Sequence, residues 1–175
     1  MNSTLSDMHV TKALAAERQL SCAIRNFFRN EDPISIHTLI GAVDQLLIDI
    51  AEERGVTLYI QNMLIQAFPG PLLAKVQKEI RKPRNFFKHA DKDPNDTLMF
   101  YPQANYLSIW FVSESFVQLF PDSCKAVNAF RNWFLVDYCK KNPVPEFYRA
   151  HFERAKSLGV VDTNFEELSK ALERP

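Results

Sequence analysis

Glycine is scarce in this chain, with four among 175 residues, and consecutive β-branched residues are few. Both shortages argue against a β-rich fold, and the many helix-forming residues favour an all-α protein. The 46% hydrophobic content is enough for one buried core at this length. We therefore predict a single helical domain over residues 1–175, built as an antiparallel bundle of about six to eight helices.

Cysteine is rare as well. Cys22, Cys124 and Cys139 are odd in number, have no paired metal-ligand spacing and follow no signal peptide. This pattern predicts reduced thiols in a cytoplasmic protein. No apolar run approaches the roughly 20 residues needed to span a bilayer. The sequence therefore predicts a soluble chain with no membrane partner.

A net charge is absent too, because 21 basic residues balance 21 acidic ones. The field of the whole molecule offers no general attraction for nucleic acid, so any RNA contact needs a local basic patch. One candidate patch has six cations against a single acid, Glu79: Lys75, Lys78, Arg81, Lys82, Arg84 and Lys88. Such a run is either a ligand site or a solvated helix face, and both readings stay open.

The same stretch, residues 73–90, has apolar residues at spacings of three and four, which predicts one amphipathic helix. Its expected buried stripe is Leu73, Val76, Ile80, Pro83, Phe87 and Ala90. The helix is expected to run through Pro83 and to bend there. Asn85 and His89 then lie on the face opposite the stripe, at about 100° per residue, and Arg84 flanks it.

Three side chains on this helix have complementary chemistry. His89 can exchange a proton near neutral pH, Arg84 can hold a phosphate or an oxyanion, and Asn85 can fix the tautomer of an imidazole ring. Together they suit phosphodiester cleavage. The alternative is a basic helix end in solvent, where the cations offset the helix dipole.

The string Arg84-Asn85-Phe86-Phe87-Lys88-His89 resembles the motif of the HEPN superfamily. In that motif an Arg, usually followed by Asn or Asp, precedes a His by less than two helical turns; here the spacing is five residues. The resemblance covers residues 33–138 as a bundle and implies a homodimer that joins two motifs in one cleft. It also implies metal-independent RNA cleavage, with no cofactor. Arg84 would bind the scissile phosphate, His89 would transfer a proton and Asn85 would steady the site.

His37 is a further candidate, near the start of the helix predicted over Ser35 to Arg54 and beside its apolar stripe. It is either a core histidine or a residue of the same cleft as His89, assisted by Asp44 or Asp49. With it, the predicted substrate-binding residues are Arg81, Lys82, Lys88 and His37. A metal site is another alternative, with His89, Asp91 and Asp93 as first ligands and Glu114, Asp137 or His37 converging on them.

Helical spacing and turn signals place the remaining elements. The expected helices are Met8 to Asn30, Ser35 to Arg54, Leu58 to Phe68, Gln103 to Phe120, Cys124 to Lys140, Glu146 to Leu158 and Phe165 to Glu173. Residues 1–7 are expected to fray, and residues 143–175 to form a C-terminal helical extension. Between the motif and the next helix, residues 91–102 are expected to be irregular and pinned onto the bundle by Leu98, Met99, Phe100 and Tyr101.

Three functions follow from these observations. The first is an HEPN-like protein that binds RNA or a nucleotide and cleaves RNA as a homodimer. The second is a noncatalytic module that binds a partner protein. The third is a small-molecule or metal site inside the bundle.

Overall fold

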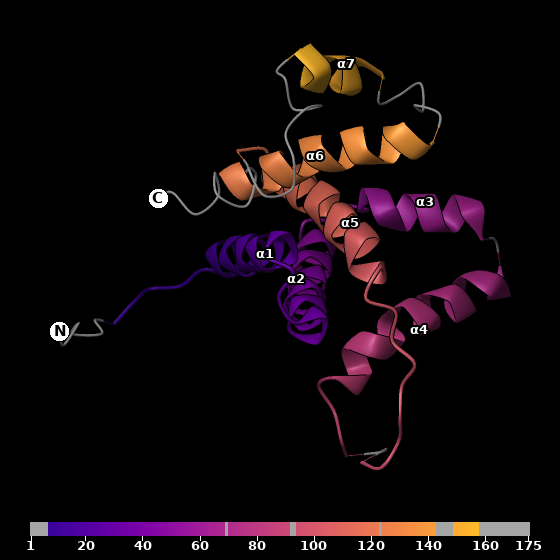
Figure 1. Cartoon of the computed structure of the whole chain (residues 1–175). Helices are drawn as coiled ribbons and strands as arrows, with labels where there is room; N and C mark the ends of the chain where they lie inside the picture. The colour runs from indigo at the N-terminus through magenta and orange to yellow at the C-terminus, as the bar shows by residue number, and fades with distance from the viewer. Residues whose placement is uncertain (1–6, 69, 92–93, 123, 143–148, 158–175) are drawn as a thin grey trace.

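A computed structural model describes residues 7–68, 70–91, 94–122, 124–142 and 149–157. These residues form helices and contain no strand, which confirms the all-α prediction (Figure 1). The number of helices is within the predicted range. They are α1 (Lys12–Phe28), α2 (Pro33–Glu53), α3 (Tyr59–Ala67), α4 (Pro71–Phe86), α5 (Ala104–Leu119), α6 (Lys125–Lys141) and α7 (Arg149–Ser157).

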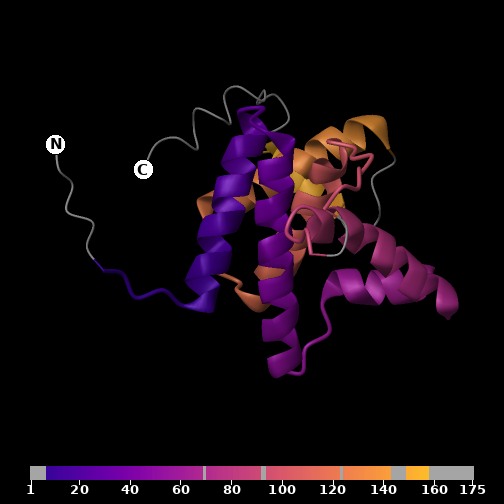
Figure 2. The same cartoon turned by 90° about the horizontal axis from the view of Figure 1, so that it is seen from below.

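The core forms where α1, α2, α5 and α6 meet. Helix α1 lies along α2, and α5 packs against both of them and against α6 (Figures 1 and 2). Each of the four helices contributes buried apolar side chains: Leu20 and Ile24, Val43 and Leu47, Ile109 and Phe116, and Val127 and Phe130. Burial of this apolar surface is the main favourable term in folding.

Local signals set the limits of α1 and α2. The Thr11 hydroxyl accepts a hydrogen bond from the Leu14 N–H at 3.1 Å, and the Asp32 carboxylate accepts one from the Ser35 N–H at 2.7 Å. Both are N-caps that satisfy otherwise free amides of a first turn. Pro33 occupies the first turn of α2, where its missing N–H costs nothing. Gly55 follows α2 with a φ of 64°, a conformation that glycine adopts without strain.

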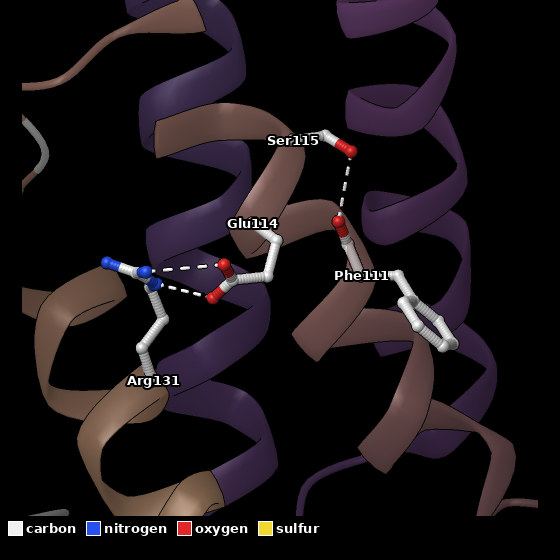
Figure 3. A network of polar contacts seen from close by, with 4 residues as sticks. All are labelled: Phe111, Glu114, Ser115 and Arg131. Atoms are coloured by element: carbon white, nitrogen blue, oxygen red, sulfur yellow. Dashed lines mark hydrogen bonds and ion pairs between the residues drawn. The ribbon is translucent and has the colours of Figure 1, made fainter. Parts of the chain in front are cut away.

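Helix α5 is apolar over most of its surface, as expected, and the two polar residues singled out in its sequence, Glu114 and Gln118, have partners. Glu114 accepts hydrogen bonds from Arg131 of α6 at 2.6 and 3.3 Å (Figure 3). Gln118 accepts from the Tyr59 N–H at 2.8 Å and donates to the Thr57 carbonyl at 3.0 Å. The first pair joins α5 to α6, and the second joins α5 to the start of α3.

Helix α4 differs from the prediction in two ways. It runs through Pro83, as expected, but it ends at Phe86 and not near Ala90. The N–H groups of Lys88 and His89 both bond to the Asn85 carbonyl, so the chain leaves the helix there. The predicted stripe is covered only in part: Leu73, Val76, Pro83 and Phe87 are half-buried, whereas Ile80 is 55% exposed and Ala90 is exposed beyond the helix end.

The reason is the position of α3 and α4, which lie on the side of the molecule away from α1 (Figures 1 and 2). Helix α4 packs against α2, and α3 packs against α5. Periodicity shows which face of a helix is apolar, but it does not show whether a neighbouring helix covers that face.

The prediction that no stretch could span a bilayer needs a correction at helix α2. By length and composition alone it could cross a membrane, although no such stretch was expected from the sequence. In the structure it packs against α1, α4 and α5. A core helix has the same composition as a spanning one.

The loop and terminal predictions had mixed outcomes. Of the four residues expected to pin the segment before α5, Leu98 and Phe100 are half-buried, whereas Met99 and Tyr101 are 77% and 67% exposed. All three cysteines are free, as predicted. The predictions of fraying over residues 1–6, of a turn at Asp93 and of a helix over residues 165–173 concern residues outside the described ranges.

Candidate functional site

A cavity of about 370 Å³ opens between α2, α3, α4 and α5. Its walls are mainly apolar, formed by Ile40, Ile60, Leu64, Ile80, Leu107 and Phe111. Its polar lining includes His37, Asp44, Gln61, Gln77, Arg81 and Arg84. Mostly apolar walls with a few convergent polar groups are typical of ligand sites, and the volume is in the usual range of about 300–1,000 Å³.

Arg84 turns toward α2 and not into solvent. Its Nη1 atom is 3.3 Å from Oδ2 of Asp44, and its side chain is only 12% exposed. Gly41 makes this approach possible: a Cβ atom there would lie 2.5 Å from Cγ of Arg84 and 2.7 Å from its Cδ. A side chain at position 41 would therefore displace the arginine stem.

Asp44 is the acidic centre of a cationic cluster. Burial raises the pKa of its carboxyl group, while the charges of Arg84, Arg81 and Lys88 act in the opposite direction. Burial lowers the pKa of Lys88, and the charge of Arg84 lowers it further. The site therefore concentrates three cations around one carboxylate.

His37 is held in one tautomer. Its Nδ1 atom is 2.9 Å from Oδ1 of Asn105, and the Asn105 amide Nδ2 donates to the Pro33 carbonyl at 2.9 Å. The second bond fixes the orientation of the amide, so Oδ1 must accept from the imidazole and the ring must carry its proton on Nδ1. Nε2 is then left with a lone pair.

The surroundings of His37 favour its neutral form. The side chain is 7% exposed, and Phe87 and Phe100 pack edge-to-face on its ring, with centroids at 5.9 and 5.1 Å. Burial lowers the pKa of His37 and the nearby Arg84 lowers it further, against the effect of the bond to Asn105. His37 is therefore both a buried histidine and a lining residue of the cavity.

The structure brings together some of the predicted site residues and separates others. Arg84, Arg81 and His37 line the cavity. The other predicted residues, Asn85, His89, Lys82 and Lys88, are exposed and outside its lining, and His89 lies on the turn beyond α4. Asn85 and His89 are both exposed, but His89 lies beyond the end of α4, so the two do not share one helix face as predicted, and His89 does not line the cavity with His37.

The acidic partners also differ from the hypotheses. Asp44 pairs with Arg84 and not with His37, and Asp49 accepts a hydrogen bond from Gln45 at 2.7 Å. In the part of the chain that the structure describes, no three His, Cys, Asp or Glu side chains are close enough to hold a metal ion. Two of the suggested ligands are engaged elsewhere: Glu114 with Arg131, and Asp137 with the Tyr106 hydroxyl at 3.0 Å.

Sequence reasoning missed Gly41 and Asn105. Gly41 had a signal, because His37, Gly41 and Asp44 follow one another at spacings of four and three and therefore share one face of α2. A glycine inside a helix costs stability, so its presence on that face indicates a close approach by another group. Asn105 had no such signal, since its partners are 68 and 72 residues away in the chain.

No protein-family model, curated protein or solved structure matches this chain. Its function is therefore inferred from the geometry of the cavity.

Proposed function

We propose that this protein is HEPN-like and binds RNA or a nucleotide, with Arg84 and Arg81 holding a phosphate at the cavity between α2 and α4. The observation that carries the proposal is the position of Arg84, whose guanidinium is at the wall of a largely apolar cavity with its side chain 12% exposed. Arginine binds phosphate through two parallel N–H groups, and a partly dehydrated arginine does so more strongly than a solvated one. The apolar walls suit a nucleobase.

Binding of fluorescently labelled short RNA and of adenosine 5′-monophosphate tests this proposal. Arg84→Ala removes a charge-assisted hydrogen bond worth about 1.5–3 kcal/mol, so we expect roughly tenfold to 150-fold weaker binding. Arg81→Ala is expected to act in the same direction. Lys75→Ala is the matched control, because Lys75 is an exposed cation on α4 outside the cavity lining. Equal losses in all three variants, or no binding by the unaltered protein, would remove the proposal.

Cleavage of RNA is the finer form of the proposal, and it requires a second copy of the chain. His89 is exposed beyond the end of α4 and is not part of the cavity lining, so we propose that a second copy brings its His89 to the cavity. Exposed apolar side chains on α3 and α4, namely Ile65, Leu72 and Ile80, offer a surface that a second copy would cover. We propose a homodimer in which Arg84 holds the phosphate and His89 transfers the proton.

Incubation with RNA in EDTA, beside Arg84→Ala and His89→Ala, tests cleavage. Activity in the unaltered protein and its loss in both variants is the expected result. A noncatalytic protein-binding module predicts instead that both variants leave association intact and that no RNA is cut. Sedimentation at several protein concentrations measures the dimer separately.

A further inference from the structure

Asp44 already pairs with the Arg84 guanidinium, which is the group that would bind the phosphate of the proposed ligand. Its carboxylate is 3.3 Å from the Arg84 guanidinium, its side chain is 31% exposed, and it lines the same cavity as Arg84 and Arg81. A phosphate that approaches Arg84 from the cavity therefore meets a carboxylate on the same guanidinium. Two anions on one guanidinium repel each other, and salt screens this repulsion less at a partly buried pair than between fully exposed charges.

We infer that the Asp44 carboxylate takes the place of a phosphate on Arg84 when no ligand is bound, and that the phosphate of the ligand displaces it. This inference rests on the proposed function. It adds that Asp44 determines the affinity of the site for a phosphate and its preference among ligands of different charge. In the empty protein Asp44 keeps Arg84 folded against α2, where Gly41 leaves room for the arginine stem. When the ligand binds, its phosphate pairs with the Arg84 guanidinium, and the ion pair between Arg84 and Asp44 is broken.

The charges around Asp44 define the ligand class. Arg84, Arg81 and Lys88 all act on its carboxylate, and His37 is kept neutral by burial. Three cations attract a phosphomonoester, which carries about 1.5–2 negative charges at pH 7, more strongly than a phosphodiester with one. The repulsion from Asp44 also grows with the charge of the ligand. Removing the carboxylate should therefore favour the monoester most.

The experiment compares three ligands of graded charge: adenosine 5′-monophosphate, the dinucleoside monophosphate ApA, and adenosine. Affinities are measured by calorimetry for the unaltered protein, Asp44→Asn and Asp44→Ser. We expect the two variants to bind adenosine 5′-monophosphate about tenfold more tightly, ApA by a smaller factor, and adenosine without change. Asp49→Asn is the matched control, since it removes the same charge from an exposed position of α2 and should leave all three affinities unchanged.

A second measurement uses the unaltered protein, so that the test does not depend on the folding of the variants. The NMR resonance of the Asp44 carboxyl carbon should shift when adenosine 5′-monophosphate is added and stay in place with adenosine. Weaker or unchanged binding of the monophosphate in the Asp44 variants, an equal gain for adenosine, the same gain in Asp49→Asn, or an unmoved Asp44 resonance would overturn the inference and leave the binding function intact. If none of the phosphate ligands binds any form of the protein, the proposed function fails and this inference fails with it.

Discussion

At the level of single residues, Gly41 is the position on which the placement of Arg84 depends. A methyl group there would meet Cγ and Cδ of Arg84 at 2.5 and 2.7 Å. We expect Gly41→Ala to destabilise the protein by about 1–3 kcal/mol, as overpacking usually does. In an Arg84→Ala background the same change should be neutral or stabilising by up to about 1 kcal/mol, because alanine is the better helix former.

Urea denaturation of the two single variants and the double variant measures this coupling. The sign of the effect of Gly41→Ala should depend on whether the arginine stem is present. An equal loss in both backgrounds would show that the methyl group disturbs α2 itself and not Arg84.

His37 gives the protein a pH dependence of stability. Its folded pKa is lowered from the ordinary value of 6.5, so between these two values the unfolded chain binds more protons than the folded protein. Stability must therefore rise with pH through this window, and it is lost as the pH falls below about 6.5. The raised pKa of Asp44 gives the opposite slope, starting above its ordinary value of 3.8.

Denaturation curves between about pH 5.5 and 7.5 test this expectation. His37→Phe, which keeps an aromatic ring between Phe87 and Phe100, should flatten the dependence. His89→Gln should leave it unchanged, because His89 is exposed. If the slope survives in His37→Phe, another group is responsible for it.

At the level of helices, the sequence predicted which helices form and in what order better than it predicted which of their side chains are buried. The expected limits of α1, α2, α3, α5 and α6 agree with the structure to within a few residues, because capping groups and apolar periodicity are local signals. Helix α4 was the exception: its apolar spacing is real, but no helix covers Ile80. Burial depends on the positions of other helices, which no local pattern encodes.

The contact between α5 and α6 offers a test at this scale. Glu114 and Arg131 form a two-point ion pair, with side chains 14% and 22% exposed (Figure 3). Arg131→Met leaves the Glu114 carboxylate without this partner, so we expect a loss of about 1–3 kcal/mol. The double variant Glu114→Leu with Arg131→Met should be more stable than Arg131→Met alone, since no charge is then left half-buried.

Urea unfolding measures both changes, and Lys125→Met on the exposed side of α6 is the control for loss of a cation. If Glu114→Leu alone is measured as well and its loss adds to that of Arg131→Met in the double variant, the two side chains act independently and the ion pair contributes little.

At the level of the whole molecule, the candidate site is assembled from segments far apart in the chain. Arg84 and Asp44 are 40 residues apart, and His37 and Asn105 are 68 residues apart. Residue chemistry and helical spacing were enough to select Arg84, Arg81 and His37 as candidates. They were not enough to pair Asp44 with Arg84, or to exclude His89 from the cavity, because both depend on how α4 is placed against α2 and where it ends.

The separation of His89 from the cavity leads to the last prediction. If cleavage uses Arg84 of one copy and His89 of the other, each homodimer of Arg84→Ala or of His89→Ala lacks a complete site. A mixed dimer has one complete site, formed by Arg84 from the His89→Ala copy and His89 from the Arg84→Ala copy. We expect mixing the two inactive variants to restore RNA cleavage to about a quarter of the unaltered activity, since about half of randomly exchanged dimers are mixed and each has one of two sites.

Cleavage of labelled RNA in EDTA after subunit exchange measures this recovery. Mixing either variant with a double variant that lacks both side chains is the control, because no mixed dimer then contains a complete site. No recovery in the first mixture, despite exchange shown by fluorescence transfer between labelled copies, would mean that Arg84 and His89 do not act across the dimer.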